Sequence, residues 1–437
     1  SVEPFYLLPI LQEKLFLLSD YSVFLPRLSS LLVAALSSIA LFLLMRSMAF
    51  SPWICASLSL LFMMDPMYVQ NFKSGRVDAW VIFAILISCW GMRKYLSCES
   101  ASGKFWCSMV SGTMLGVSAL LWPSAIVLYP LVAYFYLSNI CSFYIEKHYQ
   151  SLLGFSFSIF IVAILTYGFM FYSRHSSIIV SLGNMLSDLG MSENKESGNI
   201  FTWRETWGAM KTFEKSWGAL LLGMIGVFWS RKWMFIIALL FALLLVSHTG
   251  VYLHRSIYLL PYLYIGIACF FYASNKTIYP NLKKLGQLGL ATVLCWSFAI
   301  SMILRPAVAF SQQEVRLYQN VINAFQRISI EPNANVAFEP WELYPITRSR
   351  EWNFFRPLNE SKNLKSSNNS KAKSWAANLD YIITYKKEGY LHQVSKRHGF
   401  RRYADLSQSK NEVRNGVLSH LSNASYGPYV IYKKKDN

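Results

Sequence analysis

Residues 27 to 46 read RLSSLLVAALSSIALFLLMR, and this run decides how most of the chain folds. Between Arg27 and Arg46 stand eighteen residues without a charge, and only small hydroxyl side chains interrupt the apolar ones. A helix needs roughly 20 predominantly apolar residues to cross a hydrocarbon core of about 30 Å. The run therefore predicts a membrane-spanning helix with a basic residue at each end.

Nine further apolar runs follow the same pattern. They are residues 52 to 69, 78 to 96, 105 to 121, 123 to 140, 152 to 172, 216 to 230, 233 to 247, 256 to 273 and 287 to 304. The chain of 437 residues is 54% hydrophobic and 15% charged, with a mean hydropathy of +0.31, whereas soluble domains carry nearer a quarter charged residues. We predict a mainly α fold, with a polytopic membrane helix bundle over residues 1 to 304 and a small α/β domain over residues 305 to 437.

The distribution of charge predicts the partners and the orientation. The formal charge is +18, but Lys and Arg fall in short loops between the apolar runs and in the tail. Membrane topology and contact with membrane lipid explain this placement, so we expect no nucleic-acid partner. Cytoplasmic loops carry the excess of Lys and Arg, which places the C-terminal domain on the periplasmic side of a bacterial inner membrane. Because the chain opens at Ser1 in a loop-like segment, we expect its first span to precede this residue.

The part after residue 304 changes character. Helical periodicity appears at residues 312 to 328 and 390 to 398, and strand-like runs appear at residues 334 to 338, 379 to 385 and 426 to 432. Residues 359 to 373 are rich in Asn, Ser and Lys and predict a flexible linker. A small α/β domain is the simplest interpretation of this order.

The most informative polar stretch is DPMYVQNFKSGRVD, residues 65 to 78, at the predicted outer mouth of two spans. Ionisable groups near membrane depth are costly and tend to be functional. Arg76 and Asp78 stand at the start of a helix, where a carboxylate also complements the helix dipole. A purely structural role, with a helix cap beside an arginine that reaches for the membrane surface, stays open.

Two other outer segments carry candidate residues. Residues 248 to 261 contain Arg255 and Tyr258, and a guanidinium group binds phosphate through two parallel hydrogen bonds. Residues 173 to 215 contain Arg204 among several charges. Those charges are typical of a solvated face, and Arg204 is the better functional candidate among them.

The order of these features resembles the GT-C superfamily of polyprenyl-phosphate-sugar glycosyltransferases, in the branch of protein O-mannosyltransferases and lipid A aminoarabinose transferases. SGRVDAW, residues 74 to 80, is similar to the family's S-x-R-x-D-A element at the mouth of a helix. HRSIYLLP, residues 254 to 261, resembles the segment before a late span, and residues 112 to 123 resemble a Gly-rich span with Trp122 where the family often has Lys. The resemblance extends over about residues 4 to 270.

This resemblance implies a membrane glycosyltransferase that uses a polyprenyl-phosphate-linked donor. A hexosyl or pentosyl group would move, with inversion, to a hydroxyl of a lipid, glycan or protein acceptor at the extracytoplasmic face. A carboxylate near the acceptor acts as general base, and Arg, Lys or a divalent cation such as Mg²⁺ or Mn²⁺ stabilises the departing phosphate. We expect the family's first acid upstream of Ser1, with Glu3 as the alternative acid.

The resemblance also assigns roles to individual residues. Asp78 matches the family's second outer-loop acid and is expected to organise the site or to bind a metal, with Arg76 beside it as a catalytic residue. The residues expected to contact the lipid phosphate are Arg255, Tyr258, Lys73 and Arg204.

Two interpretations from other classes stay open. A transporter or flippase of glycolipid should show charged helices, or helices broken by Gly or Pro, near the middle of the membrane. In the sequence, the ionisable residues instead gather at one membrane surface. A catalytically silent member would only bind glycolipid, and the absence of the first acid favours it.

Overall fold

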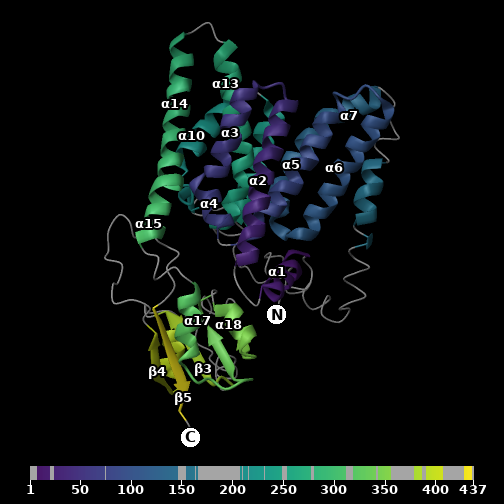
Figure 1. The fold of residues 1–437 in the computed structure, drawn as a ribbon. Coiled ribbons are helices and arrows are strands. Elements are labelled where there is room, and N and C mark those ends of the chain that lie inside the picture. The colour runs from purple at the N-terminus through teal and green to yellow at the C-terminus, as the bar shows by residue number, and fades with distance from the viewer. Residues whose placement is uncertain are drawn as a thin grey trace, which may run out of the picture. The chain divides into compact units, whose positions relative to one another are not determined.

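The structure is a computed structural model (Figure 1). It describes residues 7–19, 24–73, 75–145, 154–162, 164–165, 207–208, 210–214, 216–230, 232–248, 253–276, 280–311, 318–340, 343–355, 378–385, 390–406 and 428–435. The chain divides into two compact units, Ser1–Leu15 with Phe24–Met302, and Phe16–Val23 with Ile303–Asn437.

The first unit is a bundle of helices. In chain order it contains α1 (Leu7–Leu18), α2 (Phe24–Ser47), α3 (Pro52–Met64), α4 (Pro66–Phe72), α5 (Asp78–Tyr95), α6 (Ala101–Leu121), η1 (Pro123–Leu128), α7 (Tyr129–Ile145), α10 (Trp217–Trp229), α11 (Trp233–His248), α12 (Leu253–Ser256), η3 (Ile257–Leu259), α13 (Leu260–Lys276) and α14 (Pro280–Phe298). The π-helical segment η4 (Ala299–Leu304) crosses the boundary between the two units, and α15 (Arg305–Ser311) belongs to the second unit. Residues 27 to 46 lie within α2, as predicted.

Small residues let these helices pack closely. Ser88 of α5 and Ser111 of α6 each donate a hydrogen bond to the other's backbone carbonyl, at 2.9 and 2.7 Å. Helices α10 and α13 approach so closely that a Cβ on Gly226 would lie 1.9 Å from the carbonyl oxygen of Gly266. Such contacts through glycine and serine are typical of helix pairs in membranes.

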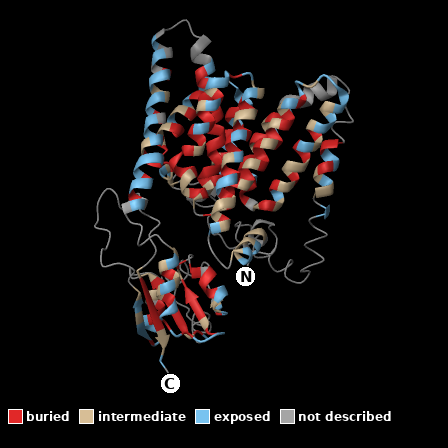
Figure 2. Cartoon of the chain, in the orientation of Figure 1, coloured by how far each residue is buried: buried red, intermediate tan, exposed pale blue. Residues whose placement is uncertain are grey.

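Large apolar side chains lie outside this bundle as well as inside it, and α14 is exposed along most of its length (Figure 2). Trp233 is 72% exposed and Leu288 is 66% exposed, and lipid accommodates such a surface whereas water does not. Within the described residues, three helices are long and apolar enough to cross a membrane: Phe24–Ser47, Ala101–Leu121 and Gly286–Val308. The chain is therefore an integral membrane protein, and most of the other predicted spans form shorter apolar helices.

The predicted span at residues 52 to 69 is wrong in one respect, because it forms two helices bent by 55°. Pro66 has no N–H and cannot continue the hydrogen-bonding pattern of α3. The Asp65 carboxylate caps α4 instead, accepting hydrogen bonds from the backbone N–H of Met67 at 2.9 Å and of Tyr68 at 3.4 Å. The sequence Asp-Pro thus both ends one helix and starts the next.

The second unit contains a five-stranded sheet with the order β2-β1-β3-β5-β4. The strands are β1 (Asn335–Phe338), β2 (Asn353–Phe355), β3 (Tyr381–Tyr385), β4 (Phe400–Leu406) and β5 (Tyr429–Lys434). Strand β1 pairs in parallel with β2 and β3, and β5 pairs antiparallel with β3 and β4. Helices α17 (Tyr318–Gln326) and α18 (Tyr344–Ser349) pack on one face, and α21 (Tyr390–Arg397) packs on the other.

This architecture confirms the expected mainly α fold with a small α/β domain. The predicted strands at 334 to 338, 379 to 385 and 426 to 432 correspond to β1, β3 and β5, and the predicted helix at 390 to 398 corresponds to α21. Strands β2 and β4 were not predicted from the sequence. The linker predicted at residues 359 to 373 lies outside the described residues.

Candidate functional site

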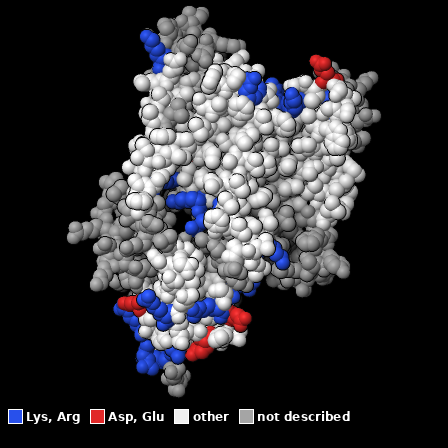
Figure 3. Space-filling view, viewed as in Figure 1, with Lys and Arg blue, Asp and Glu red and all other residues white. Residues whose placement is uncertain are grey.

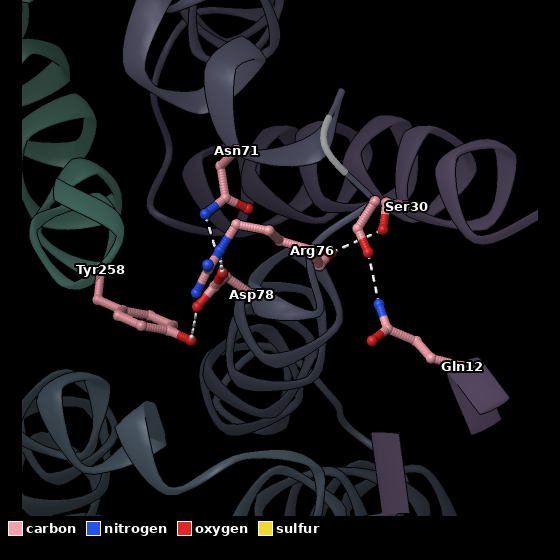
Figure 4. A network of polar contacts seen from close by, with 7 residues as sticks. Gln12, Ser30, Asn71, Arg76, Asp78 and Tyr258 are labelled. Carbon is pink, nitrogen blue, oxygen red and sulfur yellow. Dashed lines mark hydrogen bonds and ion pairs between the residues drawn. The ribbon is translucent and has the colours of Figure 1, made fainter. Parts of the chain in front are cut away.

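The candidate site is built around the turn that precedes α5. Gly75 has a φ of +75°, a left-handed conformation that glycine adopts without strain. This turn lets the Arg76 side chain fold back onto Asp78, with 2.8 Å between Nε and Oδ2. The Ser30 hydroxyl of α2 donates to the Arg76 carbonyl at 2.6 Å, and the Gln12 amide of α1 donates to the Gly75 carbonyl (Figure 4). Side chains from α1, α2 and α5 therefore hold this turn.

The Asp78 carboxylate is fully buried and accepts three hydrogen bonds. Besides Arg76, the Asn71 side chain of α4 donates to Oδ2 at 2.8 Å, and the Tyr258 hydroxyl of η3 donates to Oδ1 at 2.6 Å (Figure 4). A buried carboxylate is costly unless it is paired with a cation and fully hydrogen-bonded. Both conditions are met here, so the network is stable as it stands.

Arg76 differs from Asp78 because its side chain reaches the surface. The side chain of Arg76 is 35% exposed, while that of Asp78 is 0% exposed. Among the described residues, the two terminal amino groups of Arg76 have no hydrogen-bond partner. Asp78 therefore fixes the guanidinium group by one edge and leaves the other edge for a ligand.

Arg255 brings a second positive charge to this site. It is half-buried at the end of α12, three residues before Tyr258. Arg255 therefore lies on the same helical segment as the residue whose hydroxyl contacts Asp78. The adjacent Ser256 hydroxyl is fully buried and has no hydrogen-bond partner within the described part of the chain.

No protein-family model and no curated protein matches the sequence. Among solved structures, ArnT from Cupriavidus metallidurans in the apo state superposes with a TM-score of 0.53, at 8% identity, over 95% of this chain and 85% of ArnT. The chain has the GT-C fold. A second structure of the same protein, bound to undecaprenyl phosphate, gives a TM-score of 0.47 at 11% identity with the same coverage. At these identities the likeness concerns the fold.

Within the GT-C fold, the structure brings together four of the residues expected from the sequence. Arg76 and Tyr258 contact Asp78 directly, and Arg255 stands one helical turn before Tyr258. Lys73 is half-buried at the end of α4, two residues after Asn71. The other expected site residues, Arg204 and Glu3, lie outside the described residues.

The expected roles of Asp78 and Tyr258 change once their contacts are known. The single proton of the Tyr258 hydroxyl is donated to Asp78, so it is not available to a phosphate. The Asp78 carboxylate is buried among three donors beside a guanidinium group, which repels a second cation. The described residues contain no group of three His, Cys, Asp or Glu side chains that would hold a metal ion. This environment does not fit the metal-binding role expected for Asp78.

The structure also shows a second buried carboxylate that the sequence analysis quoted without a role. Asp65 is fully buried; besides capping α4, it accepts from the Ser216 hydroxyl at 2.8 Å and from the Tyr264 hydroxyl at 3.2 Å. The Tyr264 hydroxyl lies equally close, at 3.2 Å, to the carbonyl of Leu61, whose helical partner is lost at the break. Asp65 thus joins the α3–α4 break to α10 and α13.

Asn71 and Asp65 were missed as site residues because no local sequence pattern indicates which residues they contact. Asn71 lies seven residues from Asp78, and Tyr264 lies 199 residues from Asp65. The only local signal was the presence of several polar side chains in one apolar region, residues 65 to 78.

Proposed function

We propose that the chain is a membrane glycosyltransferase that moves a sugar from a polyprenyl-phosphate-linked donor to a hydroxyl of a lipid, glycan or protein acceptor, with inversion. The C-terminal domain would lie at the extracytoplasmic face of a bacterial inner membrane. The observation that carries the proposal is the half-exposed Arg76, held by a buried carboxylate, with Arg255 one helical turn before Tyr258 in the same network, within the GT-C fold. Guanidinium groups suit a phosphate that gains charge as its sugar leaves.

In this mechanism Asp78 positions Arg76 and does not remove a proton. A general base must come within hydrogen-bond reach of the acceptor hydroxyl, and the Asp78 carboxylate is fully buried with its oxygens already bonded. Tyr258 and Asn71 hold Asp78 in turn. The base is then another carboxylate, for which Glu3 stays the candidate in this chain.

The test is transfer of radiolabelled sugar from polyprenyl-phosphate donors by the full-length gene product in membranes. Removing one electrostatic contact to a transition-state oxyanion lowers the rate by about 100-fold or more, so Arg76→Gln should lower kcat/KM by that factor. Arg93 lies in the last turn of α5, at the other end of that helix from Arg76, and Arg93→Gln is the control. Full transfer by Arg76→Gln would refute the proposal.

The variant Asp78→Asn separates a positioning role from a base. If Asp78 orients Arg76, the variant lowers kcat/KM for the donor as Arg76→Gln does, and the pH profile of kcat keeps its acidic limb. If Asp78 is the base, kcat falls and the acidic limb disappears.

A transporter or flippase of a polyprenyl-linked glycolipid is the second candidate, favoured by one observation. The α3–α4 break at Asp65 and Pro66 is a broken apolar helix with a buried carboxylate, which is the feature expected of transporters. Movement of a fluorescent undecaprenyl-linked glycolipid between leaflets of proteoliposomes, without any transfer of its sugar, would select this candidate.

A further inference from the structure

The edge of the sheet in the second unit carries an accumulation of positive charge. Strand β4 is the edge strand and pairs only with β5, and the left-handed turn at Gly399 joins it to the end of α21. We call the Lys and Arg side chains of these three neighbouring segments the basic edge: Lys396, Arg397, Arg401, Arg402, Lys433, Lys434 and Lys435. The space-filling view shows Lys and Arg gathered over β4 and β5 (Figure 3).

Little negative charge compensates the basic edge within the described residues 396–406 and 429–435. Asp405 is the one acidic residue of these segments, and it forms an ion pair with Arg402. Arg401 stands directly opposite Lys433 in the antiparallel ladder, an arrangement in which two like charges destabilise the strand pair. Lys433 lies over the Tyr381 ring, 5.7 Å from its centroid. The sheet therefore keeps an unfavourable pair of cations side by side.

Two structural explanations account for part of this charge. Charged side chains on an edge strand prevent pairing with another sheet, and basic residues in the last turn of α21 complement its dipole. Neither explanation needs seven cations across three elements. Tyr403, at the irregularity in β4, is 44% exposed; its hydroxyl donates to the Ser329 carbonyl at 3.3 Å and its ring packs edge-on against Tyr381.

We propose that the basic edge binds the phosphate groups of anionic phospholipids at the surface of the bilayer. Clustered Lys and Arg bind anionic lipid headgroups, and an exposed Tyr is favoured in the same layer because its ring is apolar and its hydroxyl is polar. The first unit of the chain crosses the membrane, so the bilayer surface is present at a high effective concentration for any domain tethered to it. This contact is separate from the proposed donor site and does not depend on glycosyl transfer.

The experiment uses the full chain in nanodiscs of phosphatidylcholine alone or of phosphatidylcholine mixed with phosphatidylglycerol. Amine acetylation of Lys396 and Lys435 is followed by mass spectrometry, and the same two exposed amines of the detergent-solubilised chain provide the reference. Phosphatidylglycerol should slow acetylation of the two basic-edge amines relative to the reference. Raising the salt concentration should remove the difference, because salt screens exposed charges.

Matched charge variants locate the contact. Each cation near an anionic bilayer changes the binding constant by about fivefold. The double variant Arg397→Gln with Arg401→Gln should therefore bind the phosphatidylglycerol surface about 25-fold more weakly, measured as lost protection of the two amines from acetylation. The control pair, Arg327→Gln with Arg348→Gln, removes the same charge from exposed positions at the ends of α17 and α18 and should change it by less than about twofold.

Three results would overturn the proposal. Equal acetylation in both kinds of nanodisc would show that the basic edge does not bind the lipid. An equal effect of the two variant pairs would show that only the net charge of the chain matters. If the basic-edge variant keeps its protection from acetylation and forms new oligomers, these cations serve instead to prevent the sheet edge from pairing with another chain.

Discussion

Tyr258→Phe tests the network that holds Asp78, because it removes one hydroxyl and leaves the ring in place. Tyr258 is fully buried, and its hydroxyl lies 2.6 Å from Asp78 Oδ1. The chain offers a matched control in Tyr68, which is also fully buried. The Tyr68 hydroxyl lies near Ser37 but has no hydrogen-bond partner among the described residues.

The two substitutions should change the free energy of unfolding in opposite directions. A hydrogen bond to a charged group contributes about 1.5–3 kcal/mol, so Tyr258→Phe should cost about 2 kcal/mol while Asn71 and Arg76 still hold the carboxylate. A buried hydroxyl without a partner is destabilising, so Tyr68→Phe should stabilise the fold by about 1 kcal/mol. The two variants should therefore differ by about 3 kcal/mol.

Equilibrium unfolding of the full chain in mixed detergent micelles, followed by tryptophan fluorescence, measures this difference. Adding Asp78→Asn to each variant completes a double-mutant cycle. The coupling energy should be large for Tyr258 and close to zero for Tyr68. Equal stabilities of Tyr258→Phe and Tyr68→Phe would refute the argument that the buried carboxylate depends on this tyrosine.

Three further substitutions test other parts of the fold. Gly226→Ala should strongly lower the melting temperature of the first unit, because the added Cβ would overlap a carbonyl oxygen of α13. The two helices would have to separate, at a cost of at least about 3 kcal/mol. Gly289→Ala is the control in the same thermal melt, because its Cβ would meet only the end of a leucine side chain. Asp65→Ala should be far more destabilising than Asp65→Asn in the same melt, because only the alanine leaves the buried Ser216 hydroxyl and the backbone N–H of Met67 without their acceptor. Glu339→Ala should speed hydrogen exchange in α21, because the Glu339 carboxylate accepts a hydrogen bond from the backbone N–H of Leu391 at 2.8 Å. Loss of such a helix cap costs about 1 kcal/mol. Hydrogen exchange in β1 and β2 should stay unchanged.

The sequence predicts those parts of the molecule that depend on local pattern. Residues 27 to 46 predict α2 because hydrophobicity alone determines a membrane helix, and the strand-like runs predict β1 and β3 because both are buried inside the sheet. The α3–α4 break was missed although Asp65-Pro66 is a local signal, because the hydrophobicity of residues 52 to 69 outweighed it. Strand β4 was missed because an edge strand with Arg401, Arg402 and Tyr403 exposed does not show alternation of apolar and polar residues.

The candidate site was predicted only in part, for a different physical reason. Arg76 and Asp78 are two residues apart, so their pairing is readable from the sequence. The contact of Asp78 with Tyr258 spans 180 residues and depends on how η3 and α13 pack against α4 and α5. A single sequence contains no pattern that reports such a contact, and the role of Tyr258 as a partner of Asp78 became clear only from the structure.

The spacing of two tyrosines constrains how this protein can vary. Tyr258 binds Asp78 and Tyr264 binds Asp65, and the two tyrosines stand six residues apart in one continuous helical segment. Insertion or deletion of one residue between them would rotate one tyrosine by about 100° relative to the other, and one carboxylate would lose its tyrosine donor inside the bundle. The length of this segment is therefore fixed by electrostatics, while its apolar side chains are free to exchange for others of similar volume.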